Sequence, residues 1–371
     1  MFLVFLYSCK KDFKQELQEP NSPNLEVKLE VKNGIIAFKD SKSFENAMSY
    51  FHTIGIEETH KIIRQLPNFK GLIEITPNDK DDIARLNKAL WKLEEQEIRL
   101  RENMDDVPPA EALTYDDYLI HDPYYEAILN THREVMIDQL IIRSTENGVF
   151  GYEPERRLNF EAQYETPVFD QALSNAYTSD DLNGLIDMPV VLPDIYLINR
   201  DAELFDQYPP VVLTASCNGG KLATNAFGQQ QDCDTYLDNR RRIRATVWAQ
   251  NLGLYSSIGF KTRRQTRFLR VWWNTEAERL SVEGEGYYST KWPSGLVYTD
   301  YPYNRTNTKE DLTNIEKVSS PLPQPFHTAE IGIKDGKPKL KVTKKYEYKK
   351  HISDHAGWRN GIRHALEIKH N

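Results

Sequence analysis

One stretch of this sequence combines the residue types that bind anionic ligands. Between Asp238 and Glu276 the chain has no acidic residue, while basic and aromatic residues alternate through it. Arginine pairs with anions and aromatic rings stack on ligand rings, so the stretch could form a surface for anionic glycans, lipopolysaccharide or nucleic acid. The candidate binding residues are Arg242, Arg244, Lys261, Arg263, Arg264, Arg267, Arg270, Trp248, Tyr255, Trp272 and Trp273.

The same stretch also has a structural interpretation. Successive residues of a strand point to opposite faces, so the arginines could line a solvated face while Ile243, Val247 and Trp273 fill the core. Their acidic partners would then come from other parts of the chain, whose formal net charge is −8. This acidic balance argues against nucleic acid as the partner, because domains that coat nucleic acid carry a positive excess. Both interpretations stay open, and we favour the structural one.

The sequence assigns no catalytic residue, metal site or cofactor. The motifs HExxH, GxSxG and GxGxxG and the phosphate-binding glycine loop are absent. Histidines and an aspartate gather near the carboxyl end, and we interpret them as residues of a surface helix: His351, Asp354, His355 and His364. A carboxylate-dependent hydrolase stays open because Asp and Glu are plentiful, although no pair stands out by its spacing.

The sequence predicts an α+β fold that positions these residues. A small amino-terminal region of one hairpin and several helices precedes a larger, mainly antiparallel β region. Alternation over 25–32 predicts a strand, Asn33-Gly34 a type I′ turn, and 35–38 the returning strand. Helices are expected near 41–51 and 62–66 and over 78–100. Further strands are expected on both sides of an Asn147-Gly148 turn and over 243–250, 255–262, 268–273, 280–283, 329–334 and 339–347.

Pro108-Pro109 breaks the longest predicted helix and indicates a boundary. We therefore divide the chain into a signal and tether over 1–24, an α+β region over 25–107, a linker with a short helix over 108–133, and a β-rich domain over 134–371.

The amino terminus carries the clearest indication of location. An apolar run ends at Leu6-Tyr7-Ser8-Cys9, which resembles the lipobox of bacterial lipoproteins, where a small residue precedes the lipidated cysteine. The polar segment after Cys9 ends in Pro20 and Pro23, as expected of an extended tether. Because no basic residue precedes the apolar run, we expect the true start to lie upstream. The alternative is a short first strand with a buried cysteine.

Three longer segments strengthen this expectation. AFKDSKSFENAM, ILNTHREVMIDQLIIR and RRRIRATVWAQNLGLYSSIGFKTRRQTRFLRVWW are similar to recurring pieces of uncharacterised predicted lipoproteins of Bacteroidota. The resemblance implies a lipid-anchored protein of the cell envelope, in the outer membrane and facing either the periplasm or the exterior, with no established activity. It names no cofactor.

Two further cysteines, Cys217 and Cys233, flank a loop rich in Gly, Asn and Gln. In an exported chain they lie in an oxidising compartment, so we expect a disulfide contributing about 3 kcal/mol for a loop near 15 residues. Zinc is disfavoured because no second pair of Cys or His lies nearby at ligand spacing.

The leading hypothesis is a lipid-anchored envelope protein that acts as a binding or structural module. Its expected partners are the membrane, through the anchor, and a glycan or another envelope component. The alternatives are a glycan-active envelope hydrolase that uses carboxylates and an adhesin-like surface protein.

Overall fold

In the computed structural model, the first two described strands form an amino-terminal hairpin. Strand β1 (Glu30–Lys32) pairs antiparallel with β2 (Ile35–Phe38), and both turn residues, Asn33 and Gly34, have positive φ, at 52° and 75°. These angles are those of the predicted type I′ turn. The structure describes residues 27–86, 119–175, 186–187, 190–199, 223–225, 228–252, 256–268, 271–275, 277, 279–291, 299–310, 318–321, 330–334, 337–341, 345–359 and 362–370.

Short helices follow the hairpin. Helix α1 (Ser41–Ile54) begins after Asp40, whose carboxylate accepts a hydrogen bond of 2.7 Å from the backbone N–H of Ser43. Such a cap satisfies one of the free N–H groups of the first turn. Helix α2 (Ile56–Arg64) confirms the second predicted helix, and α3 (Lys80–Leu86) is the described part of the helix predicted over 78–100. A 3₁₀ turn, η1 (Leu72–Glu74), and helix α5 (Pro123–Ile128) complete this layer.

The amino-terminal sheet joins the hairpin to strands from the middle of the chain. Its order is β1-β2-β3-β4-β5-β8-β7, with β3 (Glu134–Ile137) parallel to β2 and the other pairs antiparallel. The remaining strands are β4 (Leu140–Thr145), β5 (Gly148–Tyr152), β8 (Ile195–Asn199) and β7 (Val190–Leu192). Strands β4 and β5 form the predicted hairpin, but its turn residues are Glu146 and Asn147, one position before the predicted Asn147-Gly148, because Gly148 already pairs with Thr145. The domain boundaries stay a prediction.

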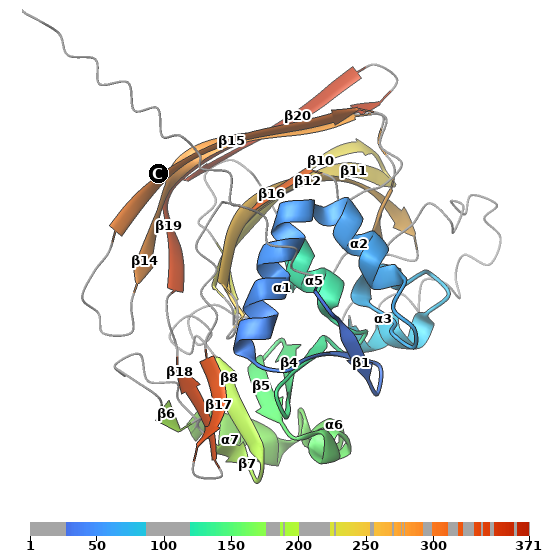
Figure 1. Cartoon of the computed structure of the whole chain (residues 1–371). Helices are drawn as coiled ribbons and strands as arrows, with labels where there is room; N and C mark the ends of the chain where they lie inside the picture. Colours follow the sequence, from blue (N-terminus) through green and yellow to red (C-terminus); the bar gives the residue numbers. More distant parts are fainter. Residues whose placement is uncertain are drawn as a thin grey trace, which may run out of the picture.

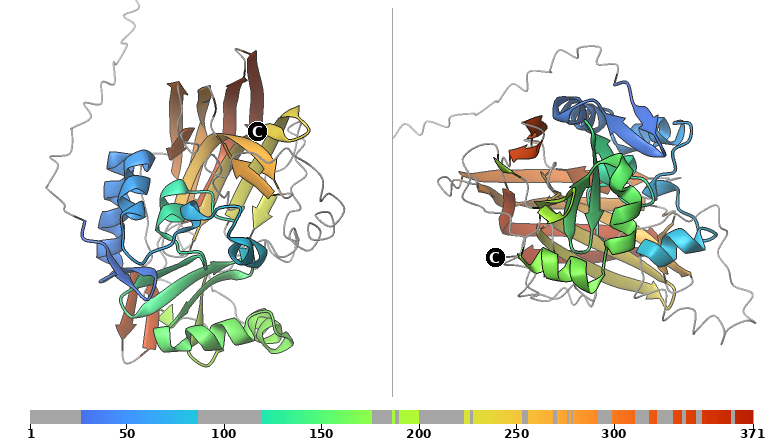
Figure 2. Two further views of the ribbon diagram at one scale, coloured as in Figure 1. Left: turned by 90° about the vertical axis from the view of Figure 1, so that its right-hand side faces the viewer. Right: turned by 90° about the horizontal axis from the view of Figure 1, so that it is seen from below.

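Two helices that the sequence did not predict cover one face of this sheet. Phe160 of α6 (Arg157–Gln163) and Phe169 of α7 (Pro167–Asn175) pack with Phe150 and Tyr152 of β5 in one buried apolar cluster. Preceding them is a 3₁₀ turn, η3 (Pro154–Arg156). Both helices lie on the side of the sheet away from the carboxyl-terminal sheets (Figure 2).

The carboxyl-terminal half forms two stacked antiparallel sheets. The inner sheet has the order β13-β12-β11-β10-β9, with β16 also paired to β12, and the outer sheet has the order β15-β14-β19-β20. The inner strands are β9 (Ala223–Asn225), β10 (Gly228–Asp238), β11 (Arg241–Asn251), β12 (Ser256–Phe268), β13 (Val271–Asn274) and β16 (Val318–Pro321). The outer strands are β14 (Arg279–Lys291), β15 (Thr299–Glu310), β19 (Lys345–Arg359) and β20 (Ile362–His370).

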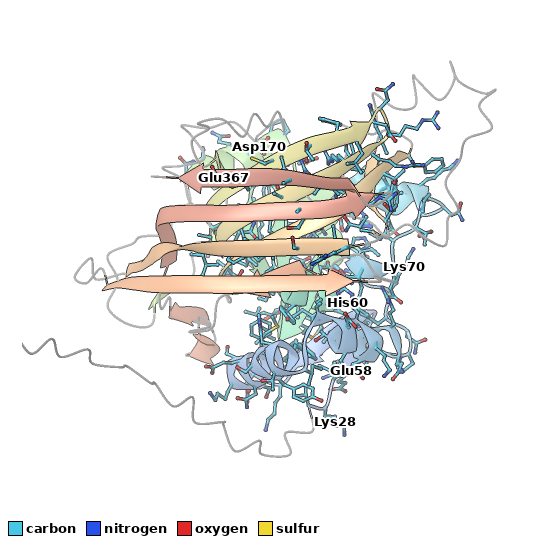
Figure 3. The ribbon with its side chains drawn as sticks, turned by 90° about the horizontal axis from the view of Figure 1, so that it is seen from above. Lys28, Glu58, His60, Lys70, Asp170 and Glu367 are labelled. Atoms are coloured by element: carbon cyan, nitrogen blue, oxygen red, sulfur yellow. The ribbon has the colours of Figure 1, made fainter. Side chains whose placement is uncertain are left out.

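The inner sheet lies between the outer sheet and helices α1, α2 and α5 (Figure 1). Toward the outer sheet it presents Ile243, Val247 and Phe260, which pack with Leu280 and Val282 in a separate apolar cluster. Seen from above, the four outer strands lie side by side as the outermost layer, with Glu367 on β20 (Figure 3). A further small sheet consists of β17 (Glu330–Lys334), β18 (Lys337–Lys341) and β6 (Ile186–Asp187). The predicted α+β fold class is thus confirmed.

The surface helix predicted near the carboxyl end is wrong. The segment forms β19 and β20, which pair along their length, and His355 stands opposite Leu366. Residues four apart share a face in a helix and also in a strand, so the spacing of the histidines could not separate the two. The strand predicted over 339–347 is likewise divided, because β18 ends at Lys341 and β19 begins at Lys345. Among the described residues no helix has the length and apolar character needed to cross a bilayer.

Candidate functional site

The predicted basic and aromatic run forms β11, β12 and β13, and most of its described candidates are buried. No more than 4% of the surface is exposed in any of Arg242, Arg244, Lys261, Arg263, Trp248 and Trp273. Arg264 and Trp272 are half-buried and Arg267 is exposed. Tyr255 and Arg270 lie outside the described residues.

The predicted strand alternation is present, but the arginine face is not solvated. Ile243 and Val247 face the outer sheet, as the structural interpretation expected, and Trp273 joins a different cluster, the largest apolar core. The opposite face of β11 is covered by protein. It carries Arg242, Arg244, Thr246, Trp248 and Gln250, all buried.

Two aspartates of the neighbouring strand neutralise this face. Asp234 accepts hydrogen bonds from Arg242 Nη1 (2.7 Å) and Arg244 Nε (3.0 Å). Asp232 accepts one from the hydroxyl of Thr246 (2.6 Å). Burial acts to raise the pKa of Asp232, but the charges of Arg244, His121 and Lys261 and the hydrogen bond from Thr246 together outweigh it, so the pKa of this carboxyl lies below its ordinary value. The arginines therefore have acidic partners, as the structural interpretation required.

A charge pattern in the sequence could have identified these partners. Aspartates at 232 and 234 and arginines at 242 and 244 have the same spacing of two, on opposite sides of a turn at Asn239. In the antiparallel pair, Asp234 stands opposite Arg244. Since residues two apart share a face of a strand, the pattern predicts cross-strand ion pairs.

The segment before α5 covers the other end of the same face. Lys261 Nζ donates to the carbonyl of His121 (2.8 Å), and Gln250 bonds the carbonyl of Leu119 (2.8 Å) and the N–H of His121 (2.9 Å). The Lys261 ammonium also lies 5.6 Å from the centre of the Trp248 ring. These contacts bind the amino-terminal region to the inner sheet, so the residues that make them have a structural role.

Several aromatic and arginine side chains remain exposed or half-buried near the turns of the β10–β11 and β12–β13 hairpins. Tyr236 is 62% exposed, and its ring centre lies 6.0 Å from that of the half-buried Trp272 at an angle of 58°. The guanidinium of Arg242 lies 4.0 Å from the centre of the Trp272 ring. Arg267 stands opposite Trp272 in the β12–β13 pairing. We call the surface of Tyr236, Arg241, Arg267 and Trp272 the aromatic–arginine end.

The two hairpins are joined at this end. The backbone N–H of Arg267 donates to the carbonyl of Arg240 over 2.6 Å. Arg241 lies 3.6 Å from Asp238, and both side chains are 39% exposed, so this pair is weak. Within the described residues no ion pair or side-chain hydrogen bond involves Arg267. This surface can therefore offer the Tyr236 ring, the part of Trp272 that Arg242 leaves uncovered, and a guanidinium that is unpaired among the described residues.

The structure describes only some of the other predicted site residues. Cys233 is fully buried on β10, whereas Cys217 and Cys9 lie outside the described residues, so the disulfide and the lipid modification stay predictions. The carboxyl-terminal histidines stand on β19 and β20. Across the described ranges, no three His, Cys, Asp or Glu residues gather closely enough to hold a metal ion.

Comparison with known proteins identifies no activity. No family model matches the sequence, and neither does any curated protein. Among solved structures, the chain is similar to a DUF4848 family protein from Bacteroides thetaiotaomicron VPI-5482, a member of a family of unknown function. The match covers 92% of this chain and 100% of that one, at 12% sequence identity and a TM-score of 0.21.

Proposed function

We propose that this protein is a binding module of the bacterial cell envelope whose aromatic–arginine end holds an anionic glycan. A lipid on Cys9 would attach it to the membrane, and the tether of residues 10–24 would separate the module from the bilayer. Each buried methylene of an acyl chain contributes about 0.8 kcal/mol, so two or more chains give lasting attachment.

The observation that supports this function best is the exposure of Tyr236 beside Trp272 and Arg267. A tyrosine that is 62% exposed leaves an apolar ring face in water, and stacking on a sugar ring would cover it. Arg267 can pair with a carboxylate or sulfate on the same glycan. The net charge of −8 argues against a protein that coats nucleic acid, because such coating needs a positive excess over a wide surface.

Binding of defined polysaccharides tests the proposal. We would titrate heparin and polygalacturonate against the chain by calorimetry, with neutral dextran as the uncharged comparison. A lost stack at about 1 kcal/mol and a lost charge-assisted hydrogen bond at about 1.5 kcal/mol together correspond to about a 60-fold change, so Tyr236→Ala/Arg267→Ala should weaken binding about that much.

Arg64→Ala is the matched control, because Arg64 is an exposed arginine at the end of α2. It should bind like the parent chain. Equal affinity of the double variant and the parent for both polyanions would refute a role for this surface. For the anchor, intact-mass measurement of membrane-fraction protein should show a lipidated Cys9, and an unmodified cysteine would refute it.

A further inference from the structure

A separate cavity of about 90 Å³ lies where the last turn of α3, strand β4 and the turn before β3 meet. Its polar lining includes Arg85, His132, Arg133, Arg143, Glu146 and Glu161. The cavity belongs to the amino-terminal region and shares no residue with the aromatic–arginine end. None of these side chains was predicted to form a site.

The turn that places His132 in the lining is rigid. The side-chain oxygen of Asn130 accepts hydrogen bonds from the backbone N–H groups of His132 (2.9 Å) and Glu134 (3.0 Å). Arg133 adopts a φ of 57°, which a residue other than glycine rarely takes, and its N–H donates to the carbonyl of Asn130 (2.8 Å). Such strain persists only where the surroundings impose it, and it is concentrated at functional sites.

Two of the three lining arginines are already neutralised. Arg133, whose side chain is 4% exposed, pairs with Glu146 at 2.9 Å and donates to the carbonyl of Leu86 in the last turn of α3. Arg143 pairs with Glu161. These pairs hold the walls of the cavity together and leave little net charge for a ligand.

Arg85 differs from the other two. Its Nη2 donates to Asp82, a carboxylate that it shares with Lys70. Its Nη1 is buried and has no hydrogen-bond partner among the described residues. A buried charged donor without an acceptor is costly, so an acceptor in the cavity would be stabilising.

His132 adds a neutral imidazole beside this donor. Burial, together with the charges of Arg85, Arg143 and Arg157, outweighs the opposing effect of Glu134 and lowers the pKa of His132 to about 4. Its Nε2 lies 3.8 Å from a carboxylate oxygen of Glu161. At neutral pH the ring therefore offers one N–H donor without adding a charge.

We propose that this cavity binds the carboxylate group of a small ligand, which accepts hydrogen bonds from Arg85 Nη1 and from the imidazole of His132. A cavity of about 90 Å³ suits a carboxylate group and the one or two carbons next to it, and it is too small to enclose a sugar ring. A dianion such as phosphate fits poorly, because Glu146, Glu161 and Glu165 line the same space.

The test is a chemical-shift titration of the intact chain, followed on the histidine ring protons at pH 7 and constant ionic strength. The probes are acetate, N-acetylglycine, its uncharged analogue N-acetylglycinamide, and inorganic phosphate. The ring signal of His132 is assigned by its loss in His132→Gln. We expect saturable shifts of this signal with both carboxylates and none with the amide. Acetate alone would indicate a free small acid, and a stronger response to N-acetylglycine would indicate a peptide carboxyl end.

Arg85→Gln should raise the apparent Kd for acetate at least fivefold, whereas Arg64→Gln should leave it unchanged. The unfolding transition of each variant checks that it folds, and Arg85→Lys, which keeps the charge but not the fork, should give an intermediate loss. No saturable shift in the parent chain, equal shifts in Arg85→Gln, or tighter binding of phosphate than of acetate would each overturn the proposal.

Discussion

Removing the charge of Asp234 should strongly destabilise the fold. Its carboxylate receives donors from Arg242 and Arg244, at 2.7 and 3.0 Å, and these three side chains are only 4 to 7% exposed. Asp234→Asn keeps the size and one acceptor oxygen but leaves two buried guanidinium groups facing a neutral amide. Breaking a buried ion pair from one side costs about 3 to 5 kcal/mol, because the remaining charge stays desolvated.

The matched control lies four residues further along the same strand. Asp238 also pairs with an arginine, Arg241, but at 3.6 Å and with both side chains 39% exposed, so Asp238→Asn should cost less than about 1 kcal/mol. Urea unfolding followed by tryptophan fluorescence measures both variants, since Trp248 and Trp273 are fully buried. If the two variants unfold within about 1 kcal/mol of each other, the buried pairs do not stabilise the protein as argued.

Three further predictions concern other parts of the chain. Gly259→Ala should destabilise by about 1 to 3 kcal/mol, because its Cβ would lie 2.4 Å from Trp248 Cζ2; urea unfolding measures this, and a Trp248→Leu background should reduce the loss. The free energy of unfolding should fall as pH decreases from about 6.5 toward 4, because burial lowers the pKa of both His52 and His132 to about 4. In this range the unfolded chain binds a proton at each histidine more readily than the folded chain does. His52→Gln should therefore reduce this loss of stability by about 2 to 3 kcal/mol. Alkylation of unreduced protein should label neither Cys217 nor Cys233, and two free thiols would disprove the disulfide.

The local rules of strand and turn formation could be read from the sequence. Alternation placed Val31 toward the core, and Asn33-Gly34 proved to be a hairpin turn. The second predicted hairpin is present, with its turn one residue earlier, at Glu146 and Asn147. The missed elements depend on contacts distant in the chain. Helices α6 and α7 are short, and they are stabilised by Phe160 and Phe169 packing on a strand that their own periodicity does not reveal.

The candidate site shows why residue types alone were misleading. A run without acidic residues suggested an exposed binding surface, yet Asp232 and Asp234, just before that run, neutralise its centre. Which charges pair depends on the register of β10 against β11, and a count of charges along the chain cannot reveal that register. The covering segment at Leu119 and His121 was even less predictable, because more than a hundred residues separate it from Lys261.

The side-chain contacts of Arg242 show that this arginine has a structural role in the protein interior. Its Nη1 donates to Asp234, its Nε donates to Gln265 (2.8 Å), and its planar face lies over the Trp272 ring. A lysine could not make all three contacts, because it lacks the flat guanidinium fork. Arg267, one strand away, makes no such side-chain contact within the described residues. Two arginines of one basic run thus differ in their environment, because the fold uses the donors of the first and, among the described residues, pairs none of the side-chain donors of the second.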